Sequence, residues 1–268
     1  MRVGYDVLGN IAIFKFDRKD RLGDKKRFAE AYLKNNKSVR TVLEKTHGFS
    51  GRLRTLKTKY LAGEKIKEAL YRENGCEFRF NVESCYFSSR LSSERMNVAK
   101  MVKRGENVLV MFGGVAPFAI VIARNSKAKR VVSVELGREC SRYAEINIKR
   151  NRLQSRVEIV QGDVRKKVSL LKLSSNFRSG GNNKFDRIVM ARPNLKDSFL
   201  DVAFPVVKRG GIIHYYGFYN ESDVEDLWKL ITNEAKKAGK KIKIVRIVKA
   251  GDIGPYKWRY RVDLKLRN

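Results

Sequence analysis

The sequence contains few cysteines, few histidines and no long apolar segment. Its 268 residues include only the cysteines Cys76, Cys85 and Cys140 and the histidines His47 and His214. Because the cysteine count is odd and no C-x-x-C pair occurs, neither a disulfide framework nor a zinc site is expected. No apolar run approaches the roughly 18 residues of a membrane span, and the N-terminal apolar stretch is too short for a signal peptide. These absences favour a cytoplasmic protein with no membrane segment and no metal centre.

Acidic residues are scarce relative to basic ones. Lys and Arg number 59 against 28 Asp and Glu, which gives a net charge of +31. With 43% hydrophobic residues the chain can still bury a core, so it is not a disordered basic tail. The charge indicates a polyanionic partner, nucleic acid first and an acidic membrane surface second, although a proteome rich in Lys and Arg would give the same total. At least one of the basic clusters should contact phosphate; they lie at 124–130, 149–156, 165–167 and 236–249.

Strand and helix patterns alternate from residue 106 onward. Strands are predicted at 108–112, 130–135, 157–161, 187–190 and 211–218, with 242–248 and 258–266 able to close the sheet. Helices are predicted at 117–124, 138–151, 198–208 (capped by Ser198) and 221–238. This alternation is typical of a parallel, doubly wound α/β sheet. The Ser-, Gly- and Asn-rich segment 174–184 is predicted to be a surface loop.

The N-terminal part, up to about residue 90, has a different pattern. Weak alternation at 7–16 and 77–87 indicates strands, and 24–34 indicates a helix. This is a small α+β unit, and a helix at about 92–102 joins it to the sheet.

The ends of the predicted strands carry groups that suit a nucleoside cofactor. The first strand of the sheet runs into MFGGVAPF (111–118), a glycine-rich turn that lets the backbone approach a ligand closely. Glu135 ends the second strand, where a carboxylate can accept hydrogen bonds from both ribose hydroxyls, and Asp163 ends the third, where it could read an adenine edge. Each group alone could instead be a turn glycine or a solvated carboxylate. Because the turn is not G-x-G-x-x-G, the three together favour S-adenosylmethionine over NAD.

At this point the sequence resembles a known family, the archaeal and eukaryotic tRNA (guanine-37-N1)-methyltransferases, over nearly its whole length. The segments that carry the resemblance are YDVLGNIAIFKF (5–16), GRLRTLKTKYLAGE (51–64), ENGCEFRFNVESCYFSSRLSSER (73–95), MFGGVAPF (111–118), GDV (162–164) and GGIIHYYGF (210–218). The resemblance implies a small tRNA-binding α+β domain at 1–85 and a class I Rossmann-like methyltransferase domain at 86–268. It also implies S-adenosylmethionine as cofactor and the anticodon stem-loop of tRNA as partner, and nothing in the sequence calls for a dimer, so a monomer is expected.

The resemblance also implies roles for individual residues. Glu94 of the S-x-E-R motif would be the general base, and Arg54 would support the target base. The implied cofactor contacts are Arg90, Arg95, Phe112, Gly113, Gly114, Val115, Glu135, Leu136, Asp163, Val164 and Ala191. The implied substrate contacts are Arg192, Pro193 and Asn194.

The chemistry supports these roles. Guanine N1 carries a proton at neutral pH, which a carboxylate such as Glu94 can remove as the methyl group arrives. Negative charge then develops toward O6, where the guanidinium of Arg54 would stabilise it. Because N1 lies on the Watson–Crick edge, the base must leave its stack and enter a pocket. Two plainer interpretations stay open: Glu94 could only cap the helix that begins at Ser92, and Arg54 could be one more phosphate contact.

The sequence departs from the family pattern in the cofactor turn and in the fourth strand. Val110 stands where Asp is common, Ala116 where Gly is common, and Glu135 where Asp is commoner. The usual N-L-P or N-P-P-Y motif is replaced by A-R-P-N at 191–194, so Ala191 offers no amide. The family's N-terminal domain, which checks the tRNA elbow, is not expected here, so that tRNA affinity would depend more on the basic surface.

Two alternatives follow from these departures. An archaeal branch with R-P in place of N-L-P also methylates the tricyclic wyosine precursor imG-14 at position 37, so this chain could act on that base, alone or in addition. The changes at Val110 and Ala191 also leave open a non-catalytic tRNA-binding relative with a decayed cofactor site.

Overall fold

A computed structural model describes residues 3–171 and 184–267 of the chain. The predicted surface loop at 174–184 lies outside these residues except for Lys184. The N-terminal unit is a four-stranded sheet in the order β1-β2-β3-β4, in which β2 and β3 are parallel and the other pairs antiparallel. Helix α1 packs on this sheet, with Phe28 and Tyr32 edge-on to the buried ring of Phe14. Its elements are β1 (Gly4–Leu8), β2 (Ile11–Lys15), α1 (Leu22–Asn35), β3 (Thr41–Lys45) and β4 (Thr58–Gly63).

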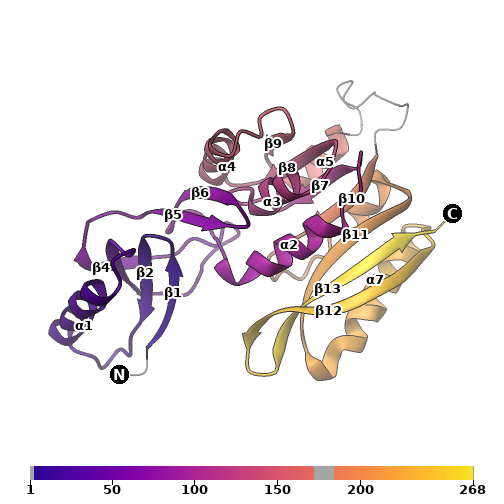
Figure 1. Ribbon diagram of the computed structural model, residues 1–268. Helices are drawn as coiled ribbons and strands as arrows, with labels where there is room; N and C mark the ends of the chain where they lie inside the picture. Colours follow the sequence, from indigo (N-terminus) through magenta and orange to yellow (C-terminus); the bar gives the residue numbers. More distant parts are fainter. Residues whose placement is uncertain (1–2, 172–183, 268) are drawn as a thin grey trace.

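A seven-stranded sheet forms the larger part of the molecule (Figure 1), in the order β12-β13-β11-β10-β7-β8-β9. The five strands from β9 to β11 are parallel, and β13 runs antiparallel to both β11 and β12. The predicted Rossmann-like sheet is therefore confirmed, with an antiparallel hairpin closing one edge. The strands are β7 (Asn107–Met111), β8 (Arg130–Glu135), β9 (Val157–Gln161), β10 (Phe185–Met190), β11 (Val207–Asn220), β12 (Ile242–Gly254) and β13 (Lys257–Leu266).

Helices cover both faces of this sheet because the central strands are apolar on both sides. In β7, Val108 and Val110 pack with α2, α3 and α4, whereas Leu109 and Met111 pack with α5, α6 and α7. This continuous apolar run is the pattern of a parallel strand buried on two faces. The helices are α2 (Ser92–Met101), α3 (Pro117–Asn125), α4 (Arg138–Arg150), α5 (Val164–Leu171), α6 (Leu200–Ala203) and α7 (Val224–Lys237).

The hairpin of β5 (Glu68–Glu73) and β6 (Cys76–Asn81) joins the two parts. Asn147 on α4 accepts a hydrogen bond from the backbone N–H of Arg79 at 2.7 Å and donates to the carbonyl of Val115 at 3.2 Å. Asn151 accepts from the N–H of Glu77 at 2.9 Å. The hairpin is thus bonded to the helix that follows β8.

The predicted helix at 198–208 is wrong in extent. Helix α6 has four residues, a 3-10 turn follows at Phe204–Val206, and β11 already begins at Val207. Pro205 explains the difference, because it has no N–H to donate and its ring obstructs the preceding turn of a helix. Ser198 still contributes its hydroxyl, which accepts from the N–H of Leu200 at 3.3 Å.

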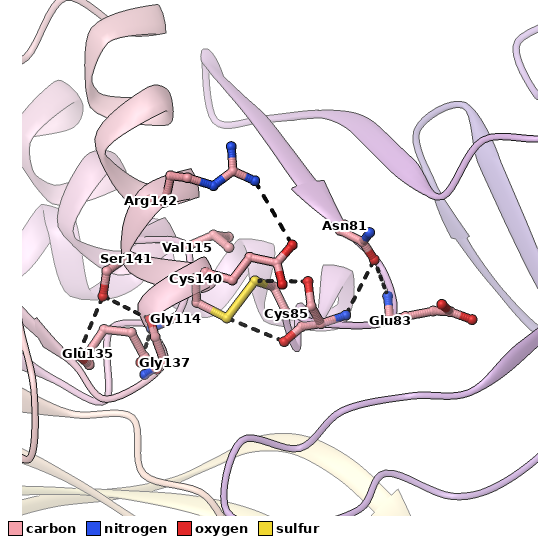
Figure 2. The surroundings of a disulfide bond; sticks show 12 residues. Asn81, Glu83, Cys85, Gly114, Val115, Glu135, Gly137, Cys140, Ser141 and Arg142 are labelled. Carbon is pink, nitrogen blue, oxygen red and sulfur yellow. Dashed lines mark hydrogen bonds and ion pairs between the residues drawn. A yellow bond between two sulfur atoms is a disulfide. The ribbon is translucent and has the colours of Figure 1, made fainter.

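Cys85 and Cys140 form a disulfide, against the expectation drawn from the cysteine count (Figure 2). Their Cα atoms are 5.5 Å apart, although 55 residues separate them in sequence. The segment after β6 runs along the start of α4, and that proximity belongs to the fold rather than to the spacing of cysteines. The remaining thiol, Cys76, is buried, which raises its pKa to about 11.

Within residues 3–171 and 184–267, no helix is long and apolar enough to cross a membrane. The same residues contain no group of three or more His, Cys, Asp or Glu side chains that could hold a metal ion.

Candidate functional site

A cavity lies at the carboxyl ends of β7, β8, β9 and β10, the edge where ligands bind in open α/β sheets. It is called the cofactor cavity because of the predicted residues that line it. Most of the predicted cofactor residues line it: Arg95, Phe112, Gly113, Gly114, Glu135, Leu136, Asp163, Val164 and Ala191, with Pro193 beside them. Val115 is fully buried next to them. Val110 is buried within the sheet and does not line the cavity. Its replacement of Asp therefore leaves the cavity wall unchanged.

The glycine-rich turn after β7 fixes the carboxylate of Glu135 (Figure 2). The N–H of Gly114 donates to Oε2 at 2.7 Å, and the N–H of Gly137 donates to Oε1 at 2.7 Å. Gly113 must lack a side chain, because a Cβ there would lie 2.1 Å from Oγ of Ser133. Burial raises the pKa of Glu135, and the backbone hydrogen bonds oppose that rise. Both oxygens are thus oriented while each retains a lone pair for a further donor.

Asp163 forms a link between the two parts of the molecule. Its Oδ2 accepts from Arg52 at 2.7 Å, and its Oδ1 accepts from the backbone N–H of Arg165 at 2.9 Å. The hydrogen bond from Arg52 lowers the pKa of Asp163 most. Arg52 lies in the loop between β3 and β4 and lines the cavity too. No role was predicted for Arg52, whose only signal in the sequence was its place two residues before Arg54 in the GRLR segment.

A second cavity of about 620 Å³ adjoins the first, between the N-terminal sheet and the turn of the β12–β13 hairpin. Its lining is basic and aromatic: Lys15, Lys45, Arg54, Arg90 and Arg259 lie with Tyr5, Phe49, Tyr86 and Phe218. Arg54 and Tyr86 line both cavities, and the guanidinium carbon of Arg54 is 3.6 Å from the centroid of the Tyr86 ring. Cations beside aromatic faces suit an unstacked base and its phosphate.

The other predicted residues fall in three places. Arg90 lines the second cavity, where it pairs with Asp6 at 3.1 Å, and Asn194 lines that cavity too. Arg95 reaches the cofactor cavity but is almost fully buried, with its guanidinium bound to the carboxylate of Glu73. Arg192 lines neither cavity. It is buried and donates to the carbonyl of Leu195 at 2.6 Å, so its guanidinium is engaged by the loop that follows β10.

Glu94 is buried on α2 and makes two short hydrogen bonds. Its Oε1 accepts from the hydroxyl of Tyr216 and from Nη1 of Arg261, each at 2.6 Å. Leu91, the residue before α2, and Arg95 on α2 line the cofactor cavity. Glu94 therefore lies just behind the cavity wall, and neither of its partners was foreseen from the sequence.

Family comparison agrees with this arrangement. Residues 69–245 match the TRM5/TYW2 methyltransferase domain, and residues 1–66 match the TYW2 N-terminal domain. The chain belongs to the TRM5/TYW2 methyltransferase family. The two matches meet at the start of β5, the first strand of the hairpin that is bonded to α4; the boundary at residue 85 stays a prediction.

Members of the TRM5/TYW2 family with both sequence and structural similarity include a tRNA (guanine(37)-N(1))-methyltransferase, Trm5b of Pyrococcus abyssi. It is 34% identical over 266 residues, which cover 98% of this chain and 74% of the relative. Its crystal structure matches 99% of this chain and 75% of its own with a TM-score of 0.84 and 32% identity. The structure of aTrm5 in complex with tRNALeu matches with a TM-score of 0.80 and 25% identity, over 98% of this chain and 72% of that one.

A relative whose name gives two methyltransferase activities is also similar to this chain. The tRNA (guanine(37)-N(1))/4-demethylwyosine(37)-methyltransferase Taw22 of Nanoarchaeum equitans is 31% identical over 306 residues. That match covers 98% of this chain and 100% of the relative.

Proposed function

We propose that this TRM5/TYW2 family member transfers a methyl group from S-adenosylmethionine to N1 of guanosine 37 of tRNA, next to the anticodon. The observation that carries the proposal is the pair of adjoining cavities that share Arg54 and Tyr86. One contains a carboxylate oriented by backbone N–H groups, and the other is larger, basic and aromatic. Methyl transfer to a base needs both kinds of site side by side.

The residues present fit the cofactor. Glu135 would accept hydrogen bonds from the ribose hydroxyls, and Asp163 lies at the adjacent strand end, where an adenine edge would be read. S-adenosylmethionine, when bound, supplies an electrophilic methyl group. Because the turn of Gly113 and Gly114 has no side chains, the backbone can approach the cofactor closely.

Arg54 and Glu94 have different roles toward the substrate base. Glu94 would take the N1 proton as N1 forms its new bond to the methyl carbon, while the bond between that carbon and the sulfonium sulfur breaks and S-adenosylhomocysteine leaves. Arg54 is held against Tyr86 at the wall common to both cavities, where a guanidinium can stabilise charge that develops on O6.

Mass spectrometry of nucleosides tests this activity. An unmodified tRNA transcript with G37, incubated with S-adenosylmethionine, should gain N1-methylguanosine. Glu94→Gln should lower the rate by about 100-fold or more, since the amide cannot take the proton. Glu145→Gln, at an exposed position of α4, should retain the wild-type rate. If wild type transfers no methyl group to any tRNA, the proposal fails.

A second candidate substrate is the tricyclic wyosine precursor imG-14 at the same position. Ala191 lines the cofactor cavity with a methyl group where the common motif has an asparagine amide, which leaves more room and one hydrogen bond fewer. The double name of Taw22 supports the same idea. The same assay on tRNA that carries the precursor separates the two substrates, because methylation of guanosine alone would remove this candidate.

We also propose that the protein acts as a monomer in the cytoplasm. The intact turn around Glu135 argues against a non-catalytic relative, which would show no S-adenosylmethionine binding by calorimetry.

A further inference from the structure

A row of buried charged side chains runs through the sheet behind Glu94. Arg261 bridges Glu94 and Asp263, His214 links Asp263 to Arg187, and Arg187 ends on Glu106. The row crosses α2, β13, β11 and β10, and all of its members are buried except Glu106, which is partly exposed. Burying so many charges is costly unless each is paired, and here every neighbour in the row is a hydrogen-bond partner.

The hydrogen bonds fix the protonation of His214. Nη1 of Arg187 lies 2.7 Å from Nε2, and an arginine can only donate, so Nε2 carries no proton. Nδ1 therefore carries the proton and donates to Oδ1 of Asp263 at 2.6 Å. Burial lowers the pKa of His214, which agrees with this neutral form. Asp263 thus receives a directed donor from His214 and remains an anion facing Arg261.

Asp263 in turn fixes the guanidinium of Arg261. Nε donates to Oδ1 at 2.8 Å and Nη2 approaches Oδ2 at 3.3 Å, a two-pronged contact that leaves Nη1 for Glu94. Although burial would raise it, the pKa of Asp263 lies below its usual range because His214 and Arg261 donate to it. Arg261 is therefore held in one orientation by an anion that does not depend on Glu94.

Both donors to Glu94 converge on one oxygen. Tyr216 and Arg261 each reach Oε1 at 2.6 Å, and among the residues that the structure describes none donates to Oε2. Glu94 is thereby anchored through one oxygen while the other keeps its lone pairs. The next residue, Arg95, does not compete, because its guanidinium is bound to Glu73.

We propose that Arg261 and Tyr216 are positioning residues for the general base: they anchor the carboxylate of Glu94 through Oε1 and leave Oε2 to take the N1 proton. This rests on the proposed function. When Oε2 gains that proton Glu94 becomes neutral, and Arg261 keeps Asp263 as its counter-ion, so the row accommodates both protonation states. The charged and titratable groups that face Glu94 are Tyr216 from β11 and Arg261 from β13, with Asp263 and His214 behind them.

Single-turnover methyl transfer at saturating S-adenosylmethionine tests the proposal. Removing a donor to Oε1 lets the carboxylate turn away from the substrate, so the rate of the chemical step should fall while the affinities for cofactor and tRNA stay unchanged. We expect about a tenfold loss of rate for Tyr216→Phe and a larger loss for Arg261→Met, with Arg261→Lys in between. In a Glu94→Gln background Tyr216→Phe should cost nothing further, because its effect is exerted through Glu94.

A control and a second readout separate this role from a structural one. Arg156→Met removes an arginine that donates to the carbonyls of Ser126 and Ala128 rather than to Glu94 or its partners, and should leave the rate unchanged. Tyr216→Phe deletes a single oxygen, so it tests the proposal even if the Arg261 variants fail to fold. Its affinity for S-adenosylmethionine should equal that of wild type.

The outcomes are distinct. A folded Tyr216→Phe protein that reacts at the wild-type rate, or that loses rate equally when Glu94 is already replaced by Gln, overturns the positioning role while the methyltransferase assignment stands. A wild-type protein that transfers no methyl group overturns the proposed function and this inference with it.

Discussion

Two carboxylates beside the cofactor cavity are held by different kinds of donor. Glu135 is bound by backbone N–H groups, one on each oxygen, whereas Glu94 is bound by a hydroxyl and a guanidinium on the same oxygen. Backbone donors orient a carboxylate without neutralising it, so Glu135 stays a strong acceptor for hydroxyl groups. The two donors on Glu94 occupy one oxygen and leave the lone pairs of the other for a proton.

Replacement of Glu135 should therefore affect cofactor binding more than catalysis. Glu135→Ala removes the acceptor for two hydroxyl groups, and we expect the affinity for S-adenosylmethionine to fall by about 10- to 100-fold. Because the pKa of Glu135 is raised, the wild-type affinity should also begin to fall, as pH is lowered, at a pH above that of an ordinary glutamate. Calorimetric titration across pH measures both effects. An unchanged dissociation constant in the variant would exclude a ribose role.

At the scale of elements, Asn147 joins three of them. Its side chain bonds the backbone of β6 and the carbonyl of Val115 in the cofactor turn, from a fully buried position on α4. Asn147→Ala leaves those two backbone groups unpaired, and we expect the free energy of unfolding to fall by about 2–4 kcal/mol. Urea denaturation measures the change, with Asn35→Ala at an exposed site of α1 as the control. A loss no larger than that of the control would contradict this role.

Most of the elements near the site follow from sequence periodicity. The strands at 130–135 and 157–161 have the predicted bounds, because continuous apolar runs between polar turns leave little ambiguity. The helix at 198–208 was wrong because the apolar residues around Pro205 suit a helix face and a buried strand equally well. For the same reason the start of β11 was placed four residues late.

The site was predictable to the extent that motifs mark it. The positions of Glu135, Asp163 and the glycine turn follow from strand ends, and Glu94 and Arg54 from the family resemblance. The partners Arg52, Tyr216 and Arg261 lie far from these motifs in sequence, and only tertiary packing brings them to Asp163 and Glu94. The Cys85–Cys140 disulfide escaped prediction for the same reason.

At the scale of the whole molecule, part of the positive charge gathers at the second cavity. The second cavity brings together basic side chains from the N-terminal sheet, from Arg90 in the segment between β6 and α2, and from the β12–β13 hairpin. These parts are distant in sequence, so the cavity exists only when both units are folded together. A tRNA that spans them would contact several cations at once.

Binding of tRNA should accordingly weaken steeply with salt. Each phosphate contact adds about 0.7–0.9 to the slope of the logarithm of the binding constant against that of salt concentration. Lys45→Gln, at the wall of the second cavity, should reduce the slope by about one such contact. Lys34→Gln on the exposed side of α1 should not. If the affinity of the wild type for tRNA hardly changes with salt, the net charge of +31 reflects a general bias in composition and not tRNA binding.

The Cys85–Cys140 disulfide also closes the backbone into a covalent ring. The ring contains α2 with Glu94, the glycine turn after β7, and Glu135, so the proposed base and the proposed ribose acceptor belong to one closed loop of chain. A single peptide-bond cleavage between the two cysteines would open the ring without parting the chain. The nicked protein would migrate as one species on a denaturing gel until a reductant released two fragments. The disulfide thus keeps the parts of the cofactor site covalently joined after a single cleavage between the two cysteines.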